Sequence, residues 1–113
     1  MVRDKSIDGY ETVVTWADSL RRQWGGDPLL EDPDKLEALD AFCEIAGKDP
    51  DELVAFCFLR RKETGERFTS QKRRAEVMGK LNDFVAASGL NGTAARRLKS
   101  NVISFLTHNG VLM

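Results

Sequence analysis

The sequence predicts an all-α protein, a compact antiparallel bundle of four helices with an additional helix at its N-terminus. Apolar residues recur at helical spacing along most of the chain, whereas no segment alternates apolar and polar residues as a strand does. Glycine, proline and capping residues divide this pattern into helices joined by short connections, which favours antiparallel neighbours. The 113 residues are enough for one compact domain and too few for two.

The first helix is expected from about Ile7 to Trp24, where the Gly25-Gly26 pair ends it. Its apolar residues at helical spacing are Val13, Trp16, Ala17, Leu20 and Trp24. The segment DPLLEDP follows as a connector. We therefore expect residues 1–30 to form an N-terminal helix and connector and residues 31–113 to form the bundle, within one compact domain overall.

The second and third helices begin with similar signals. Asp32 is expected to cap the second helix, with Pro33 at its first position, and Gly47 stops it. The third helix follows the cap Asp49, and Glu52 is placed to complete a capping box. This helix is expected to end in RRKETGERF, a polar connector. The apolar stripes of the two helices are Leu36, Leu39, Phe42, Cys43 and Ala46, and then Leu53, Phe56, Cys57 and Leu59.

The last two helices follow polar caps. Thr69 or Ser70 is expected to cap a helix over residues 71–88, which Gly89 ends. Asn91 or Thr93 is expected to cap the last helix, which runs to Asn109-Gly110. Their apolar stripes are Val77, Met78, Leu81, Phe84 and Val85, and then Leu98, Val102, Phe105 and Leu106.

Composition excludes several classes of protein. No apolar run is long enough to span a bilayer, and the N-terminus MVRDKSIDGYE lacks the apolar core of a secretory signal. Cys43 and Cys57 lie among apolar residues, so we expect buried free thiols in a reducing cytoplasm. The pattern gives no metal site and no cofactor motif.

The charges divide unevenly along the chain. Residues 1–58 carry six basic and fourteen acidic residues, a net charge of −8, whereas residues 59–113 carry eleven basic and four acidic residues, a net charge of +7. Such a division is typical of a protein with one face for a polyanion. It is equally explained if the two halves attract each other within the fold.

A basic face is expected on the last two helices. On a helical wheel Arg96, Arg97, Ser100 and Ser104 project away from the apolar stripe, and Lys99 lies at its flank. No acid follows Asn91. The preceding helix adds Lys72, Arg73 and Lys80, with Arg74 in its first turn, where the helix dipole disfavours cations. Arginine forks and short hydroxyl side chains suit phosphate oxygens. Solubilising charges paired with the acidic half are the alternative.

Three segments together resemble a known family. LEALDAFCEIAGKDPDELV, LNDFVAASGL and TAARRLKSNVISFLTHNGV are similar, in order and spacing, to the N-terminal core-binding domain of tyrosine recombinases, the phage-integrase-like enzymes. The resemblance covers residues 36–111. It implies a SAM-like helical domain that binds double-stranded DNA as one half of a clamp for DNA recombination and integration. The DNA contacts it implies, by helix and face, are Lys72, Arg73, Lys80, Arg96, Arg97, Lys99, Ser100 and Ser104.

The resemblance also implies what other parts of such a protein do. The catalytic arginines, histidines and tyrosine of the family lie in a second domain, and His108 and Tyr10 do not supply them here. We therefore expect this chain to be non-catalytic, with the catalytic domain of its parent and neighbouring recombinase subunits as partners. The acidic LLEDPDK departs from the family, whose members often carry basic residues there. A helical protein–protein interaction module using the acidic half is the alternative function.

Overall fold

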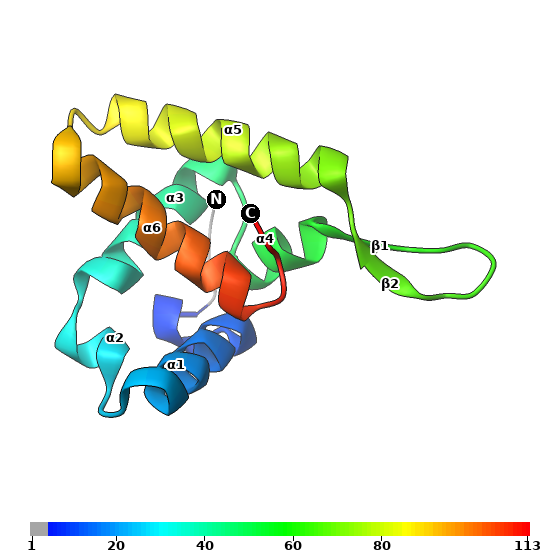
Figure 1. The fold of residues 1–113 in the computed structure, drawn as a ribbon, viewed down its shortest axis with the longest axis horizontal. Helices are drawn as coiled ribbons and strands as arrows, with labels where there is room; N and C mark the ends of the chain where they lie inside the picture. The colour runs from blue at the N-terminus through cyan, green and yellow to red at the C-terminus, as the bar shows by residue number, and fades with distance from the viewer. Residues whose placement is uncertain (1–4) are drawn as a thin grey trace.

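The computed structural model describes residues 5–113, and helices make up most of that range (Figure 1). The expected all-α class is therefore confirmed in its broad sense, with one small two-stranded sheet added. The elements are η1 (Ile7–Gly9), α1 (Glu11–Trp24), α2 (Pro28–Glu31), α3 (Asp34–Ala46), α4 (Pro50–Phe56), β1 (Phe58–Arg60), β2 (Arg67–Thr69), α5 (Gln71–Ala87) and α6 (Gly92–His108).

Helix α6 lies between α5 and α1 and also packs on α3 (Figure 1). Its buried side chains include Val102, Phe105 and Leu106, as the apolar stripe predicts. Phe105 meets Trp16 of α1 edge to face, with ring centroids 5.5 Å apart and an interplanar angle of 75°. Because these side chains are fully buried, α6 forms the centre of the core and only its opposite side can meet solvent.

Helix α1 differs from its expected form at both ends. It begins at Glu11 rather than near Ile7, and a distant residue caps it. The Asp51 carboxylate of α4 accepts hydrogen bonds from the Thr12 backbone N–H at 3.0 Å and from the Thr12 hydroxyl at 2.6 Å. At the other end Trp24, expected in the apolar stripe, is 74% exposed because no neighbouring element covers the last residue of α1.

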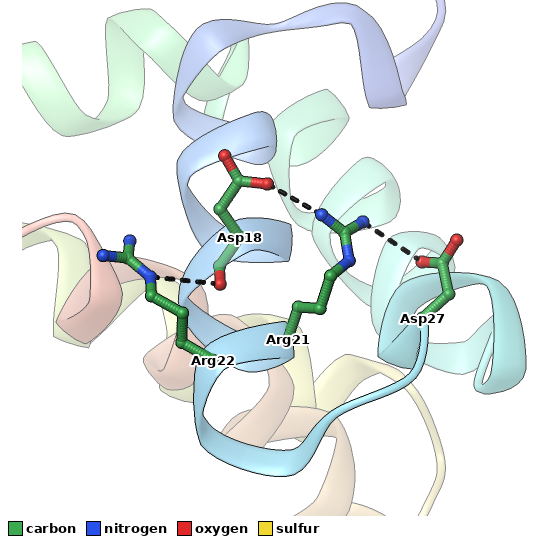
Figure 2. A network of polar contacts seen from close by, with 4 residues as sticks. All are labelled: Asp18, Arg21, Arg22 and Asp27. Atoms are coloured by element: carbon green, nitrogen blue, oxygen red, sulfur yellow. Dashed lines mark hydrogen bonds and ion pairs between the residues drawn. The ribbon is translucent and has the colours of Figure 1, made fainter.

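Charged side chains lie on both sides of the turn after α1 (Figure 2). Gly25 and Gly26 both have positive φ, 75° and 64°, which favours glycine. The Arg21 guanidinium spans the turn, at 2.9 Å from the Asp18 carboxylate and 3.8 Å from that of Asp27. The connector DPLLEDP then forms the single turn α2, which buries Leu29.

Of the predicted caps of the later helices, those of α4 and α5 are confirmed and that of α3 is wrong. Asp49 and Glu52 form the expected capping box, with bonds of 2.7 and 3.0 Å. Ser70 caps α5 by accepting from the Arg73 N–H. The prediction that Asp32 caps α3 is wrong, because the helix begins at Asp34 and the Asp32 carboxylate faces other charged groups.

The expected connector RRKETGERF is instead a β-hairpin. Strands β1 and β2 pair antiparallel, with Phe58 opposite Thr69, Leu59 opposite Phe68 and Arg60 opposite Arg67. The hairpin extends away from the helices beside the start of α5 (Figure 1). Sequence reasoning missed it because each strand has three residues, too few to show alternation.

Cys43 and Cys57 are both buried and form no disulfide, as the sequence predicts. Burial raises the pKa of the Cys57 thiol above its ordinary value of 9.0, against a smaller lowering by Arg74 and Arg73. The unfolded chain therefore ionises this thiol first as the pH rises. The free energy of unfolding should then fall above about pH 9, by at most about 1.4 kcal/mol per pH unit.

Urea unfolding of the wild type and of Cys57→Ala at about pH 8 and about pH 10 measures this contribution. The wild type should lose more stability than the variant between these two values, because lysine titration is common to both proteins. Equal losses would show that the folded thiol ionises as easily as the unfolded one.

Candidate nucleic-acid interface

The outward side of α6 is an exposed strip without acids. Thr93, Arg96, Ser100 and Thr107 are exposed along it, and the sequence has no aspartate or glutamate from Asn91 to Met113. One flank of the helix faces α1 and α3, and the other faces α5. We call Thr93, Arg96, Ser100 and Thr107 the α6 strip. Arg96 is the charged residue of this strip and makes it positive.

Arg96 and Ser100 are one turn apart, so their side chains share this strip. The Arg96 Nη2 donates to the Thr93 hydroxyl at 3.3 Å, which orients the guanidinium along the helix surface. The remaining N–H groups of this exposed guanidinium can reach an anion. Together with the Ser100 hydroxyl, they offer donors of the kind that contact phosphate oxygens.

Arg97 and Lys99 lie on opposite flanks of α6. Arg97 points toward the start of α3, where its Nη2 lies 3.7 Å from the Asp32 carboxylate. Its side chain remains 64% exposed, so this pair is weak and leaves the guanidinium accessible. Lys99 is half-buried. Attraction between the acidic and basic halves of the chain thus occurs at Arg97, beside the acidic LLEDPDK segment.

Ser104 does not belong to the exposed strip, so its expected outward position is wrong. It is half-buried between α6 and α1, and its hydroxyl accepts a hydrogen bond from the Trp16 indole N–H at 3.1 Å. A buried indole N–H requires such an acceptor. The signal available in the sequence was Trp16 itself, which needs a polar partner somewhere in the core.

Two of the three basic residues at the start of α5 support the fold. Arg73 donates to the Phe56 carbonyl at 3.1 Å and lies 5.0 Å above the Phe56 ring, at the C-terminal end of α4. Arg74 donates to the Leu112 carbonyl at 2.7 Å. Because a cation is favourable at a helix C-terminus, α4 and the C-terminal segment explain this placement without a ligand.

Lys72 and Lys80 are exposed on α5, but their surroundings are mixed in charge. Glu76 and Asp83 are exposed on the same helix, and at 100° per residue both fall within 40° of Lys72. The outward side of α5 is therefore close to neutral. Of the residues predicted to contact DNA, the structure brings Arg96 and Ser100 together, while Lys72 and Lys80 lie on this separate, mixed surface.

The hairpin carries a further group of exposed basic residues. None of them is among the residues that the sequence predicts to contact DNA. These are Arg60, Arg61, Lys62 and Arg67. They precede α5 in the chain, and the run RRK was the available signal. The sequence could not show that these residues lie on a hairpin that extends away from the helices (Figure 1).

The chain matches no protein-family model, no curated protein and no solved structure. Within residues 5–113, no group of three or more histidine, cysteine, aspartate or glutamate side chains is arranged to hold a metal ion. None of the helices in this range has the length and apolar character needed to cross a membrane.

Proposed function

We propose that this chain is a DNA-binding domain of the core-binding type, which contacts double-stranded DNA through the α6 strip. The observation that carries the proposal is the exposed Arg96–Ser100 pair on a helix that has no acid from Asn91 onward. A helix that is only solubilised by its charges usually mixes acids with its bases. The resemblance of residues 36–111 to the core-binding domains of tyrosine recombinases points to the same function.

In this proposal the helices form a SAM-like bundle and the domain holds DNA without cutting it. Arg96 contacts a phosphate through its free N–H groups. The short Ser100 side chain allows the DNA backbone to approach α6 closely. Arg97 and Lys99 add charge from the two flanks of α6. A catalytic domain of the same parent protein would supply cleavage and rejoining, and neighbouring recombinase subunits would be further partners.

Titration of a labelled duplex at several salt concentrations tests the proposal. Affinity should fall between about 50 mM and about 200 mM salt, with a log–log slope of about −0.9 for each phosphate neutralised. Arg96→Gln should weaken binding about fivefold to tenfold and make the slope shallower by about 0.9.

Arg22→Gln is the matched control for this experiment. Arg22 is an exposed arginine of α1 whose Nε donates to the Asp18 carbonyl, so its loss removes the same charge away from α6 (Figure 2). The control should bind DNA as the wild type does. Affinity that does not depend on salt, or equal losses in the two variants, would contradict the α6 contact.

A hollow on the acidic half favours a second candidate, a helical protein-interaction module. The hollow lies between α1, α2 and α3, and its lining includes Val14, Leu30 and Leu36 with Asp8 and Asp18. Leu30 is 78% exposed and Val14 is 48% exposed, so two apolar side chains of this hollow face solvent together. Chemical-shift mapping distinguishes the two functions, because DNA should perturb α6 whereas a protein partner should perturb residues 8–36.

A further inference from the structure

The β1–β2 hairpin is an ordered arm rather than a loose connection. Its strands are paired in register, and the Arg61 N–H donates to the Glu66 carbonyl at 2.9 Å across its tip. Gly65, with φ of 71°, donates its N–H to the Arg61 carbonyl at 2.8 Å. The arm extends beyond the helices (Figure 1). Its side chains are therefore presented to solvent in a fixed arrangement.

Arg60 and Arg67 lie directly opposite each other across the two strands. Side chains of such a pair point to the same face of the hairpin, and two like charges there destabilise the sheet. An arm that served only as a connection would be more stable with an acid at one of these positions. An anion between the two guanidiniums removes the repulsion, so the arrangement favours an anionic ligand.

Both guanidiniums are already held in place. The Arg67 guanidinium stacks on the Phe58 ring, with its carbon 3.7 Å from the ring centroid. Stacking occupies the flat face of the group and leaves its in-plane N–H donors free. Arg60 donates one N–H to the Gly65 carbonyl at 3.0 Å and keeps its others. Both arginines also line one shallow hollow, together with Ala55, Phe58 and Leu59.

The opposite face of the hairpin is less suited to an anion. Arg61 lies 3.7 Å from the Glu66 carboxylate and 5.0 Å from the Phe68 ring centroid, so its charge is partly balanced. Lys62 is exposed near the tip. The face with Arg60 and Arg67 is therefore better suited to an anion, and Lys62 and Glu63 near the tip add no net charge.

We propose that Arg60 and Arg67 bind the phosphate backbone of double-stranded DNA, as a second contact separate from the α6 strip. This inference rests on the proposed DNA-binding function. The described residues extend 44 Å along their longest axis, with the hairpin at one end and the start of α6 at the other (Figure 1). One turn of B-DNA is about 34 Å long, so the separation of the two contacts along this axis is within the length of a duplex of about 20 base pairs.

The test compares the double variant Arg60→Gln with Arg67→Gln, the single variant Arg96→Gln and the wild type, all as the full chain. The probes are a duplex of about 20 base pairs, longer than a helical turn, and one of about 8 base pairs, shorter than a turn. The hairpin variant should bind the long duplex at least about tenfold more weakly, with a salt slope shallower by about 1.8. Its affinity for the short duplex should change less.

Lys5→Gln combined with Arg22→Gln is the control, since it removes two charges from exposed residues in and before α1. This control should bind both duplexes as the wild type does. Thermal unfolding of the hairpin variant provides a second measurement. Its melting temperature should change little, because the substitutions remove a repulsion between like charges together with the Arg67–Phe58 stacking and the Arg60–Gly65 hydrogen bond.

The outcomes separate the two proposals. If the wild type binds both duplexes and the hairpin variant binds as tightly, the hairpin contact is overturned and DNA binding by α6 stands. If the hairpin variant is weakened and Arg96→Gln is not, the hairpin contact stands and the α6 strip is overturned. If the wild type binds neither duplex, both are overturned. An equal loss of affinity for a polyglutamate peptide would overturn the assignment to phosphate.

Discussion

Replacing Trp16 by alanine is expected to lower the free energy of unfolding by about 3–5 kcal/mol, the usual cost of removing a large buried aromatic side chain. Trp16 is 0% exposed and stacks edge to face on Phe105, so its loss leaves a cavity where α1 meets α6. It also removes the indole N–H that donates a hydrogen bond to the Ser104 hydroxyl. A domain of this size is stable by only about 5–15 kcal/mol, so the variant should be close to unfolding.

Urea unfolding followed by far-ultraviolet circular dichroism measures this loss without depending on tryptophan fluorescence. Trp16→Phe keeps most of the packing and removes the indole N–H, so it should cost about 1–2 kcal/mol. Val14→Ala is the control on the same helix, because Val14 is 48% exposed and its truncation leaves no buried cavity. A similar small loss in Trp16→Ala and Val14→Ala would contradict the described core.

Replacing Asp51 by alanine is expected to destabilise the fold by about 2 kcal/mol through the loss of a cap. The Asp51 carboxylate accepts from both the N–H and the hydroxyl of Thr12, at the first turn of α1. It also places a negative charge at the N-terminus of that helix, where the helix dipole favours one. Its removal therefore loosens the contact between α4 and α1 as well as the helix end.

Equilibrium unfolding of three variants separates these contributions. Asp51→Asn keeps an acceptor oxygen without the charge, so its stability should lie between those of Asp51→Ala and the wild type. Asp83→Ala, on the exposed side of α5, should change stability by less than about 0.5 kcal/mol. If Asp51→Ala were as stable as Asp83→Ala, the carboxylate would not act as the cap.

The sequence predicted the features that depend on near neighbours. The Asp49–Glu52 capping box and the helix limits at Gly47 and Gly89 involve residues a few positions apart, and each agrees with the structure. The cap of α1 could not be predicted in this way, since Asp51 is 39 residues from Thr12. Such a contact exists only once α4 has packed beside the start of α1.

The candidate site shows the same limit. Periodicity correctly placed Arg96 and Ser100 on the exposed side of α6, because that side is defined by the apolar stripe opposite. It could not show that Arg73 reaches the Phe56 carbonyl, that Arg74 reaches the Leu112 carbonyl or that Ser104 accepts a hydrogen bond from Trp16. A basic residue is visible in a sequence, but the group that its side chain meets depends on the tertiary fold.

The end of α6 and the base of the hairpin meet at one joint. Gly110 lies just after Asn109, the C-cap of α6, and a β-carbon at its position would lie 3.7 Å from the tip of the Phe58 ring. That ring is the surface on which Arg67 stacks. The segment that follows α6 and the ring on which Arg67 stacks therefore lie close together. A double-mutant cycle that combines Arg96→Gln with the hairpin substitutions measures whether the two surfaces contribute additively to affinity.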